Sequence, residues 1–286
     1  MIAGGGGRMK EVHSLGELRL ARQGLPGPLG FVPTMGYLHA GHLSLVRRAK
    51  SECASVAVSI FVNPAQFGPN EDLAAYPVDL PRDQALLEQA AVDLLWVPTA
   101  DQMYPAGFQT WVTVEELTRP LEGEHRPGHF RGVATIVAKL FNAMHPDRAY
   151  FGQKDAQQLA VVRRLAQDLD FPLEVVACPT MREADGLAMS SRNARLNPKE
   201  RQAASVLYRA LSAAQQAHAG GEREAGALRR SMVEILQAEP LSRIQYVSVA
   251  DPETLAELQG EVRRTLLSMA VFVGKTRLID NVLLGD

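Results

Sequence analysis

Two histidines three residues apart are the first residues whose type and spacing suggest chemistry. His39 and His42 enclose Gly41 and follow an apolar run, residues 29–32, that ends in a turn at Gly36. A helical pattern begins directly after them, so the expected order is strand, glycine turn and helix. The free N–H groups and dipole of a helix N-terminus suit a phosphate. Imidazoles there can bind phosphate oxygens and, when protonated, neutralise the charge of a breaking phosphoryl bond.

The same spacing also fits a metal-binding pair or two surface histidines at a turn. Glycines on both sides of His39 let the backbone approach a ligand closely, which favours a nucleotide phosphate over these alternatives.

Two later segments carry groups that suit phosphate oxygens. Lys154 lies in a sharp turn, residues 152–155, where a strand passes into a helix. A point charge there would meet a nucleotide phosphate at the carboxyl end of the sheet, although a solvated lysine explains this segment better when it is taken alone. Ser190 and Ser191 precede Arg192, and hydroxyls with a planar guanidinium can clamp phosphate oxygens. The alternative for these serines is an N-cap run before the next helix.

Composition limits the class of protein. The chain has 286 residues, of which 46% are hydrophobic and 22% charged, which predicts a globular protein with two domains. The formal net charge of −2 provides no general attraction to nucleic acid or membrane. No apolar run approaches the ~20 residues of a membrane span. We expect no secretory signal at the start of the chain, and residues 4–7 are typical of a flexible glycine leader.

Cysteine usage bears on localisation. Cys53 and Cys178 lie far apart without metal-ligand spacing, and each is next to an apolar run. Buried, reduced thiols are therefore expected, which fits a cytoplasmic protein.

The elements that must position these groups alternate in type. Strands are expected at residues 29–32, 54–62, 93–97, 148–151 and 173–177, and helices at 12–23, 83–91, 132–145 and 156–169 in addition to the helix after His42. The strand at 54–62 is almost uniformly apolar, as in a parallel sheet buried on both faces. This alternation predicts an α/β fold with a Rossmann-like doubly wound parallel sheet. The long segment between residues 63 and 81 is expected to act as a lid.

The pattern changes after residue 180. Helical stripes at residues 203–214 and 228–236 are followed by strands at 244–249, 265–273 and 278–283. We therefore expect an ATP- and substrate-binding domain at residues 1–180 and a smaller C-terminal α+β lid domain at 181–286.

Four segments together carry a resemblance to a known family. PTMGYLHAGH, SIFVNPAQF, FGQKDAQQ and READGLAMSSRN, in this order, resemble the pantothenate synthetase (pantoate–β-alanine ligase) family. The HxGH segment alone indicates only the wider superfamily of nucleotidylyltransferases and class I aminoacyl-tRNA synthetases. NPAQF and QKDAQQ separate this ligase from its relatives, and the resemblance covers the chain from about Met9.

The resemblance implies a two-step reaction. The carboxylate of pantoate attacks the α-phosphate of ATP to give pantoyl adenylate and pyrophosphate, and the amine of β-alanine then displaces AMP to give pantothenate. It also implies Mg²⁺ with ATP, a homodimer, and no nucleic-acid or membrane partner.

The resemblance also implies the site residues. His42 would be the catalytic histidine, with His39 and Lys154 beside it, and Gln66 and Gln158 would bind pantoate, Gln66 also meeting β-alanine. Arg126 and His129 match a segment near the pantoate pocket, whereas the stretch 81–84 makes a protein ligand for Mg²⁺ doubtful. The residues expected to bind ATP are Met35, Gly36, Tyr37, Leu38, His39, Ala40, Gly41, His42, Gly152, Gln153, Lys154, Asp155, Met181, Met189, Ser190, Ser191 and Arg192.

Two other functions remain open on the residues alone. A nucleotidylyltransferase would transfer the nucleotide to a phosphate-bearing acceptor, for which basic residues would be expected where this chain has Gln66 and Gln158. For a catalytically silent nucleotide- or RNA-binding module, a lost histidine or a basic face would be expected, and the sequence has neither.

Overall fold

The computed structural model describes residues 9–68, 73, 74 and 76–285. The glycine leader expected at residues 4–7, and part of the expected lid at 63–81, lie outside these residues. The chain divides into two units. The first comprises the chain up to Glu115 with Arg126–Gly152 and Val161–Cys178, and the second comprises Glu116–His125, Gln153–Ala160 and the chain from Pro179 onward. The domain boundary expected near residue 180 stays a prediction.

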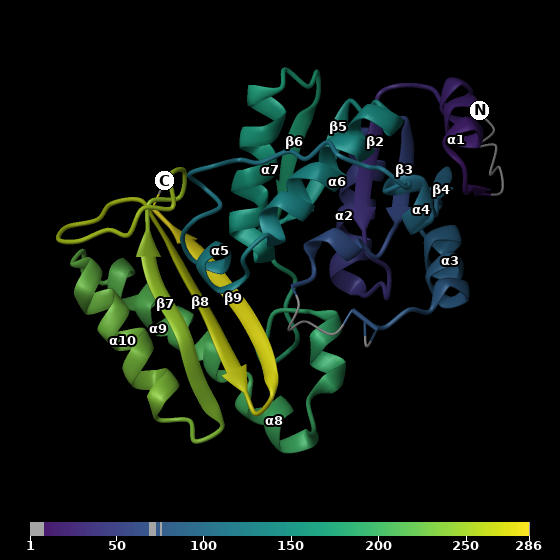
Figure 1. The fold of residues 1–286 in the computed structure, drawn as a ribbon. Helices are drawn as coiled ribbons and strands as arrows, with labels where there is room; N and C mark the ends of the chain where they lie inside the picture. Colours follow the sequence, from purple (N-terminus) through teal and green to yellow (C-terminus); the bar gives the residue numbers. More distant parts are fainter. Residues whose placement is uncertain (1–8, 69–72, 75, 286) are drawn as a thin grey trace, which may run out of the picture. The chain divides into compact units, whose positions relative to one another are not determined.

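A parallel sheet forms the centre of the first unit (Figure 1). Among the described residues it has six strands in the order β1–β4–β3–β2–β5–β6, and each neighbouring pair is parallel. The strands are β1 (Lys10–Val12), β2 (Leu29–Thr34), β3 (Ser55–Ile60), β4 (Leu94–Trp96), β5 (Arg148–Gly152) and β6 (Glu174–Cys178). Adjacent β2, β3 and β5 have helices between them in the sequence, which confirms the predicted doubly wound α/β architecture.

The helices of this chain begin where the local chemistry provides caps. The helices up to β6 are α1 (Leu15–Gln23), α2 (Ala40–Glu52), α3 (Leu80–Gln89), α4 (Ala100–Met103), α5 (Glu122–His125), α6 (His129–Met144) and α7 (Ala156–Asp168). Ser14 and Glu17 form the capping box of α1. The prediction that this helix begins at residue 12 was wrong, because Val12 ends the short edge strand β1 instead.

Two further boundaries differ from the predictions. Helix α3 begins at Leu80, three residues early, because the Asp79 carboxylate accepts the N–H of Arg82 as an N-cap. Helix α6 begins at His129 rather than residue 132, after Gly128 in a left-handed conformation with φ 81°. The helix predicted at residues 132–145 is otherwise confirmed, and its apolar side chains lie in the core.

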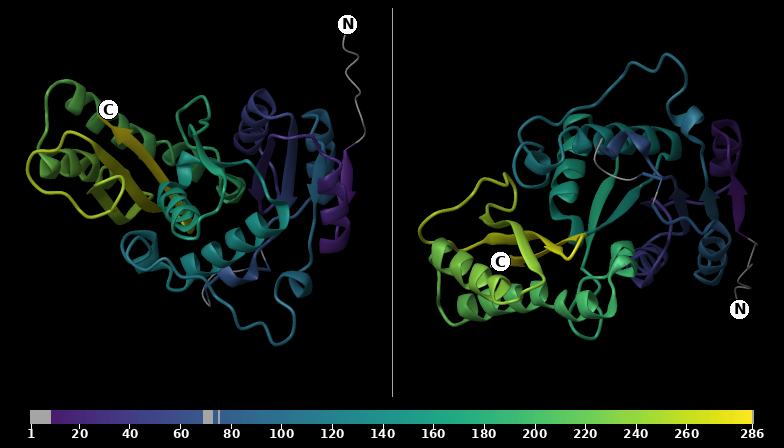
Figure 2. Two further views of the ribbon diagram at one scale, coloured as in Figure 1. Left: turned by 90° about the horizontal axis from the view of Figure 1, so that it is seen from above. Right: turned by 60° about the horizontal axis from the view of Figure 1, so that its bottom comes forward.

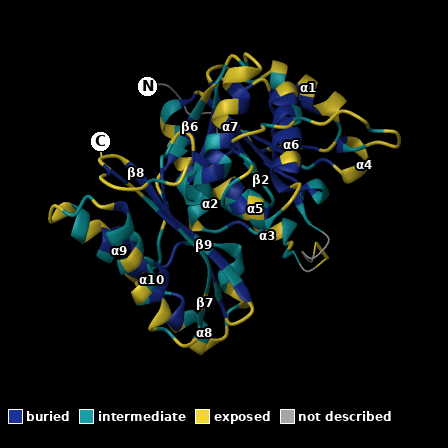
Figure 3. Cartoon of the chain, turned by 60° about the vertical axis from the view of Figure 1, so that its left-hand side comes forward, coloured by how far each residue is buried: buried dark blue, intermediate teal, exposed yellow. Residues whose placement is uncertain are grey.

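Burial follows the expected pattern in the first unit (Figure 3). All six residues of β3 are buried, as a central parallel strand requires. Cys53 and Cys178 are free and buried, in agreement with their expected role as core thiols. Within the described part of the chain, no helix is long and apolar enough to cross a membrane.

The second unit is built on an antiparallel sheet. Its strands, among the residues described, are β7 (Ser242–Ala250), β8 (Thr265–Val273) and β9 (Thr276–Leu284), in that order across the sheet. Figure 2 shows α9 (Val206–Ala219) and α10 (Ala225–Gln237) lying along this sheet, and α8 (Pro198–Ala203) precedes them in the chain. This α+β arrangement confirms the predicted fold class of the C-terminal part.

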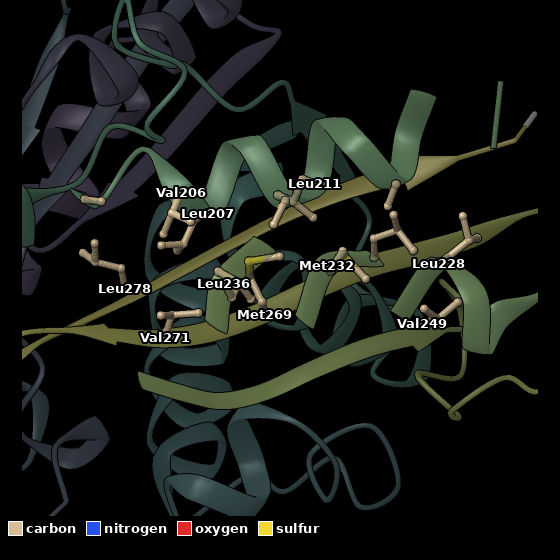
Figure 4. Packing of buried hydrophobic residues seen from close by; sticks show 14 of the residues in the cluster. Val206, Leu207, Leu211, Leu228, Met232, Leu236, Val249, Met269, Val271 and Leu278 are labelled. Atoms are coloured by element: carbon tan, nitrogen blue, oxygen red, sulfur yellow. The ribbon is translucent and has the colours of Figure 1, made fainter. Parts of the chain in front are cut away.

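Apolar side chains from the two helices and the sheet meet in one core (Figure 4). Leu207 and Leu211 of α9, and Met232 of α10, are at most 1% exposed and belong to the same cluster as Met269 and Val271 of β8. Burying side chains of this size stabilises the fold by about 1.5–3 kcal/mol each. This core holds β8 and β9 in place.

Candidate active site

The backbone between β2 and α2 forms a tight turn, residues 34–42, which we call the histidine turn. Gly36 has φ 83°, and a Cβ there would lie 3.1 Å from the Cγ2 of Ile60 and 3.2 Å from a carboxylate oxygen of Asp83. Its N–H donates to the Thr34 hydroxyl at 3.2 Å. A side chain at Gly36 is therefore strained by the backbone conformation and would also crowd Ile60 and Asp83.

The two histidines cap helix α2 reciprocally. The N–H of Gly41 donates to Nδ1 of His39 at 3.1 Å, and the N–H of His39 donates to Nδ1 of His42 at 3.3 Å. The two rings are close, with centroids 4.1 Å apart. Because both Nδ1 atoms accept hydrogen bonds, each neutral ring has its proton on Nε2, which makes Nε2–H a donor. The turn thus presents imidazole donors at a helix N-terminus, where the dipole also attracts anions.

A buried carboxylate supports the same turn from α3. Asp83 is 1% exposed, and its Oδ1 accepts the N–H of Leu38 at 2.8 Å. Burial raises the pKa of Asp83, while hydrogen bonds from the N–H groups of Leu38 and Tyr37 act in the opposite direction. Tyr37 has a positive φ of 50°, so these bonds stabilise a conformation that non-glycine residues rarely adopt. Asp83 was not among the expected site residues.

Gln66 lies in a second polar group of the first unit, in the 3₁₀ turn η1 (Pro64–Gln66). Its Nε2 donates to the sulfur of Met35 at 3.1 Å, and its Oε1 accepts from Nδ2 of Asn63 at 2.9 Å. Asn63 is 2% exposed and also accepts from the hydroxyl of Tyr104 at 2.8 Å. Burial raises the pKa of Tyr104 to about 12, so this hydroxyl remains a donor at neutral pH.

Helix α6 closes this group from the other side. Nδ1 of His129 lies 2.8 Å from the carbonyl oxygen of Gln66, so Nδ1 carries the proton, and Nε2 accepts from Arg126 at 3.1 Å. Gly132 permits the close approach, because a Cβ there would lie 2.2 Å from the carbonyl oxygen of Ala65. The structure therefore brings Met35, Gln66, Arg126 and His129 together.

The lysine of the second unit lies in a turn held by a distant residue. Residues 152–155, which we call the lysine turn, end β5 and include the 3₁₀ turn η2 (Gln153–Asp155). Nζ of Lys154 lies 3.5 Å from the carboxylate of Asp155, and the lysine side chain is 16% exposed. The side-chain amide of Asn281 donates to the carbonyl oxygens of Gln153 at 3.0 Å and Lys154 at 2.8 Å. The turn thus depends on a residue of β9.

Residues 181–192, which we call the serine loop, are held in part by their own backbone. The N–H of Met189 donates to the carbonyl oxygen of Met181 at 2.9 Å, so these two methionines lie opposite each other. The hydroxyl of Ser190 accepts the N–H of Arg192 at 3.2 Å as the N-cap of η3 (Ser191–Arg195). The alternative considered for the serines, an N-cap run, is therefore correct for Ser190, whose hydroxyl can still bind a second partner.

Arg182 anchors the serine loop to β9. Its guanidinium makes two bonds to the carboxylate of Asp280, at 2.7 and 3.0 Å, and stacks over the ring of Tyr208 at 4.5 Å. Asp280 is 2% exposed, and burial raises its pKa, whereas the bond from Arg182 lowers it. Neither Asp280 nor Asn281 was expected from the sequence, although a polar pair inside an otherwise apolar strand was a readable signal.

Gln158 is partly exposed on the first turn of α7. Among the described residues, no group of three or more His, Cys, Asp or Glu side chains could hold a metal ion. The polar groups described above are mainly donors and amides, which suit phosphates and a hydroxy acid better than a cation.

Comparisons with known proteins agree with this geometry. A family model described as Pantoate-beta-alanine ligase matches residues 8–283. Proteins named pantothenate synthetase from Herpetosiphon aurantiacus and a Roseiflexus species are 58% and 59% identical over 96% of this chain, and the matches span 100% and 99% of those proteins.

Solved structures give the same result. The crystal structure of pantothenate synthetase from Thermus thermophilus has a TM-score of 0.92 and 52% identity, and covers 96% of this chain and 99% of that one. Pantoate-beta-alanine ligase from Francisella tularensis, complexed with beta-gamma ATP and beta-alanine, has a TM-score of 0.78 and 34% identity, with coverage of 96% and 97%.

Proposed function

The chain belongs to the pantoate–β-alanine ligase family, and from this we propose that it condenses pantoate with β-alanine at the expense of ATP. In the first step a carboxylate oxygen of pantoate bonds to the α-phosphorus, and the bond from that phosphorus to the bridging oxygen breaks, which releases pyrophosphate. In the second step the amine of β-alanine attacks the acyl carbon, the bond from carbon to the adenylate oxygen breaks, and AMP leaves while the amine loses a proton.

The observation that carries this proposal is the pair of reciprocally capping histidines. The fixed Nδ1 acceptors of His39 and His42 leave Nε2–H as the donor of each ring at the N-terminus of α2. We assign to His42, supported by His39, the stabilisation of charge on the phosphates during adenylation. A nucleotidylyltransferase would use the same turn, and family membership is what favours the ligase.

Residues of the second unit would add positive charge and donors for the phosphates. Lys154 contributes a point charge, and Ser190, Ser191 and Arg192 contribute hydroxyls and a planar fork that matches phosphate oxygens. Residues 35–42 of the histidine turn would contribute their backbone to the nucleotide site. The remaining residues expected for ATP, which are Gly152, Gln153, Asp155, Met181 and Met189, would complete it.

The glutamines suit a hydroxy acid. Gln66 has one amide N–H committed to Met35 and its oxygen to Asn63, and it retains donor and acceptor capacity for pantoate and for β-alanine. We assign pantoate to Gln66 and Gln158, with Arg126 and His129 fixing the main chain of Gln66. No covalent nucleophile on the protein is needed because ATP provides the activation.

We further propose that Mg²⁺ enters with ATP, that the active form is a homodimer, and that the chain is cytoplasmic. Mg²⁺ bound with a nucleotide typically takes phosphate oxygens and water with few protein ligands, and we propose the same here. Reduced, buried cysteines fit a reducing compartment.

The test is isotope exchange between pyrophosphate and ATP in the presence of Mg²⁺ and without β-alanine. We expect exchange to require pantoate, because only a reversible adenylation step returns labelled pyrophosphate to ATP. His42→Ala should lower this exchange. His13→Ala, at an exposed histidine, is the matched control and should keep the wild-type rate. Exchange with a phosphorylated acceptor but not with pantoate would contradict the proposal and indicate nucleotidyl transfer.

A further inference from the structure

Strand β9 carries two adjacent polar residues, Asp280 and Asn281, inside the second unit. They are 2% and 5% exposed, although they interrupt an apolar strand. Burying a carboxylate and an amide costs free energy unless their hydrogen bonds are made. What these two side chains bind therefore indicates what they do.

Asn281 binds chiefly the main chain of the lysine turn. Its Nδ2 uses both hydrogens on the lysine turn, donating to the carbonyl oxygens of Gln153 and Lys154. Its Oδ1 lies 3.4 Å from the side-chain amide of Gln153. Two consecutive carbonyl groups held by one planar amide fix the peptide planes of the turn, and with them the direction of the Lys154 side chain.

Asp280 binds the serine loop at the same time. Its carboxylate pairs with Arg182, whose guanidinium also donates to the carbonyl oxygen of Gly186 at 3.0 Å. One oxygen of Asp280 additionally accepts the N–H of Asn281 at 2.8 Å, which ties the two anchors together. Gly186 can adopt φ 90° against the ring of Tyr208, where a Cβ would lie only 1.8 Å away.

We propose that Asp280 and Asn281 are positioning residues for the adenylation step, holding the lysine turn and the serine loop in one fixed arrangement within the second unit. The proposal rests on the function proposed above, because it assigns these two segments to the phosphates of ATP. Neither residue acts on the substrate; each acts through main chain or through Arg182. A misplacement of about 1 Å in such groups can cost roughly 10²-fold in rate.

Asp280 and Asn281 should affect the rate of adenylation more than the rate of attack by β-alanine. Adenylation builds and releases the charge of pyrophosphate, so it depends on groups placed at the phosphates. The attack of β-alanine on a pantoyl adenylate already formed releases AMP, so charge develops only on the α-phosphate and no β- or γ-phosphate is present. Loss of positioning should therefore separate the two rates, whereas a general loss of folding would lower both.

The experiment uses Asn281→Asp in the full chain, which keeps the side-chain shape but places a carboxylate oxygen against two carbonyl oxygens. We expect the maximal rate of pantoate-dependent ATP–pyrophosphate exchange to fall on the order of 10²-fold. Conversion of supplied pantoyl adenylate by β-alanine should fall by less than about threefold, because it needs alignment at the acyl carbon rather than at the phosphates. Asn142→Asp makes the same chemical change at an exposed position of α6 and should leave both rates unchanged.

A second variant covers the case in which Asn281→Asp does not fold. Asn281→Ala removes the two hydrogen bonds without introducing repulsion and should show the same separation with a smaller loss of exchange. Equal loss in both half-reactions, or no loss in either, would overturn the positioning role. Absence of pantoate-dependent exchange in the wild-type chain would instead overturn the proposed function, and this proposal with it.

Discussion

The histidine turn and the lysine turn are expected to serve the same ligand, but they are held in different ways. His39 and His42 cap their own helix across two or three positions of the sequence. The lysine turn takes its carbonyl partners from Asn281, which is 127 positions from Lys154. The first arrangement is encoded within one continuous segment, whereas the second exists only after the sheet of the second unit has formed.

This difference shows when a sequence motif is sufficient to determine the geometry of a turn. A strand, a glycine with positive φ and a self-capping helix start are each determined by neighbouring residues, so the motif carries its own geometry. The residues next to Lys154 provide a charge but do not fix its position, which depends on Asn281 in a distant strand. Variants at the two turns can test this contrast.

The largest effect on the exchange rate is expected at His42 and Lys154, the side chains of the two turns that are proposed to contact the phosphates. His42→Ala should lower pantoate-dependent ATP–pyrophosphate exchange by about 10³-fold, because removing one oriented donor from a developing charge costs this much. Lys154→Ala should be comparable, while Lys199→Ala, at an exposed lysine, should have no effect. Retention of exchange in either variant would remove that turn from the chemistry and end the comparison.

The next effect concerns another long-range anchor in the second unit. Glu122 is 7% exposed and accepts two bonds of 2.7 Å from Arg277 and one of 3.0 Å from the hydroxyl of Tyr246. Glu122→Gln should destabilise the chain by about 3 kcal/mol in urea unfolding, because it leaves the Arg277 guanidinium, whose side chain is only 19% exposed, without its carboxylate.

The control for that measurement is an exposed ion pair. Glu253→Gln removes the partner of Arg264 at a side chain that is 76% exposed, and should change stability by less than about 1 kcal/mol. If the two variants lose the same stability, long-range anchoring is not what holds segment 116–125 to this unit.

A smaller effect is expected where the histidine turn does use a distant residue. Asp83→Asn keeps one oxygen for the N–H of Leu38 but loses the acceptor that faces Tyr37, so exchange should fall by about tenfold at most, the equivalent of one hydrogen bond. Burial raises the pKa of Asp83, so its ionisation destabilises the fold as pH rises above the ordinary value of 3.8. The stability of the variant relative to wild type should therefore increase from pH 4 to pH 7.

If Asp83→Asn lowers exchange as much as Asn281→Asp does, the contrast between the two turns is wrong. That result would show that the histidine turn depends on its distant partner as strongly as the lysine turn does. Asp101→Asn, at an exposed aspartate of α4, is the control for the loss of charge.

The smallest effect is expected at a fully local contact. Hydrogen bonds from the N–H groups of Ser14 and His13 lower the pKa of Glu17 to about 2. Since the folded-state pKa is depressed, this stabilisation is present above the ordinary value of 4.5 and is lost as pH falls towards 2. Wild type should therefore lose more in Tm between pH 5 and pH 3 than Glu17→Gln does, and equal losses would exclude this capping contribution.

Sequence reasoning succeeded where the determinants are close together in the chain. The doubly wound sheet followed from the alternating apolar runs, and the order strand, glycine turn and helix around His39 followed from adjacent residues. It failed at Val12, because a three-residue edge strand is too short to show a period of two. Asp280 and Asn281 were missed because nothing near them in the sequence identifies the segments that they bind.

The dependence of the lysine turn on Asn281 also has a consequence for synthesis of the chain. The ribosome must add 127 residues after Lys154 before the amide that holds its carbonyl group exists. At typical elongation rates this interval is roughly 6–25 s. During that time the emerging first unit can complete its histidine turn, but the nascent chain cannot yet fix its lysine turn. That turn therefore reaches its final form only after residue 281 has been added.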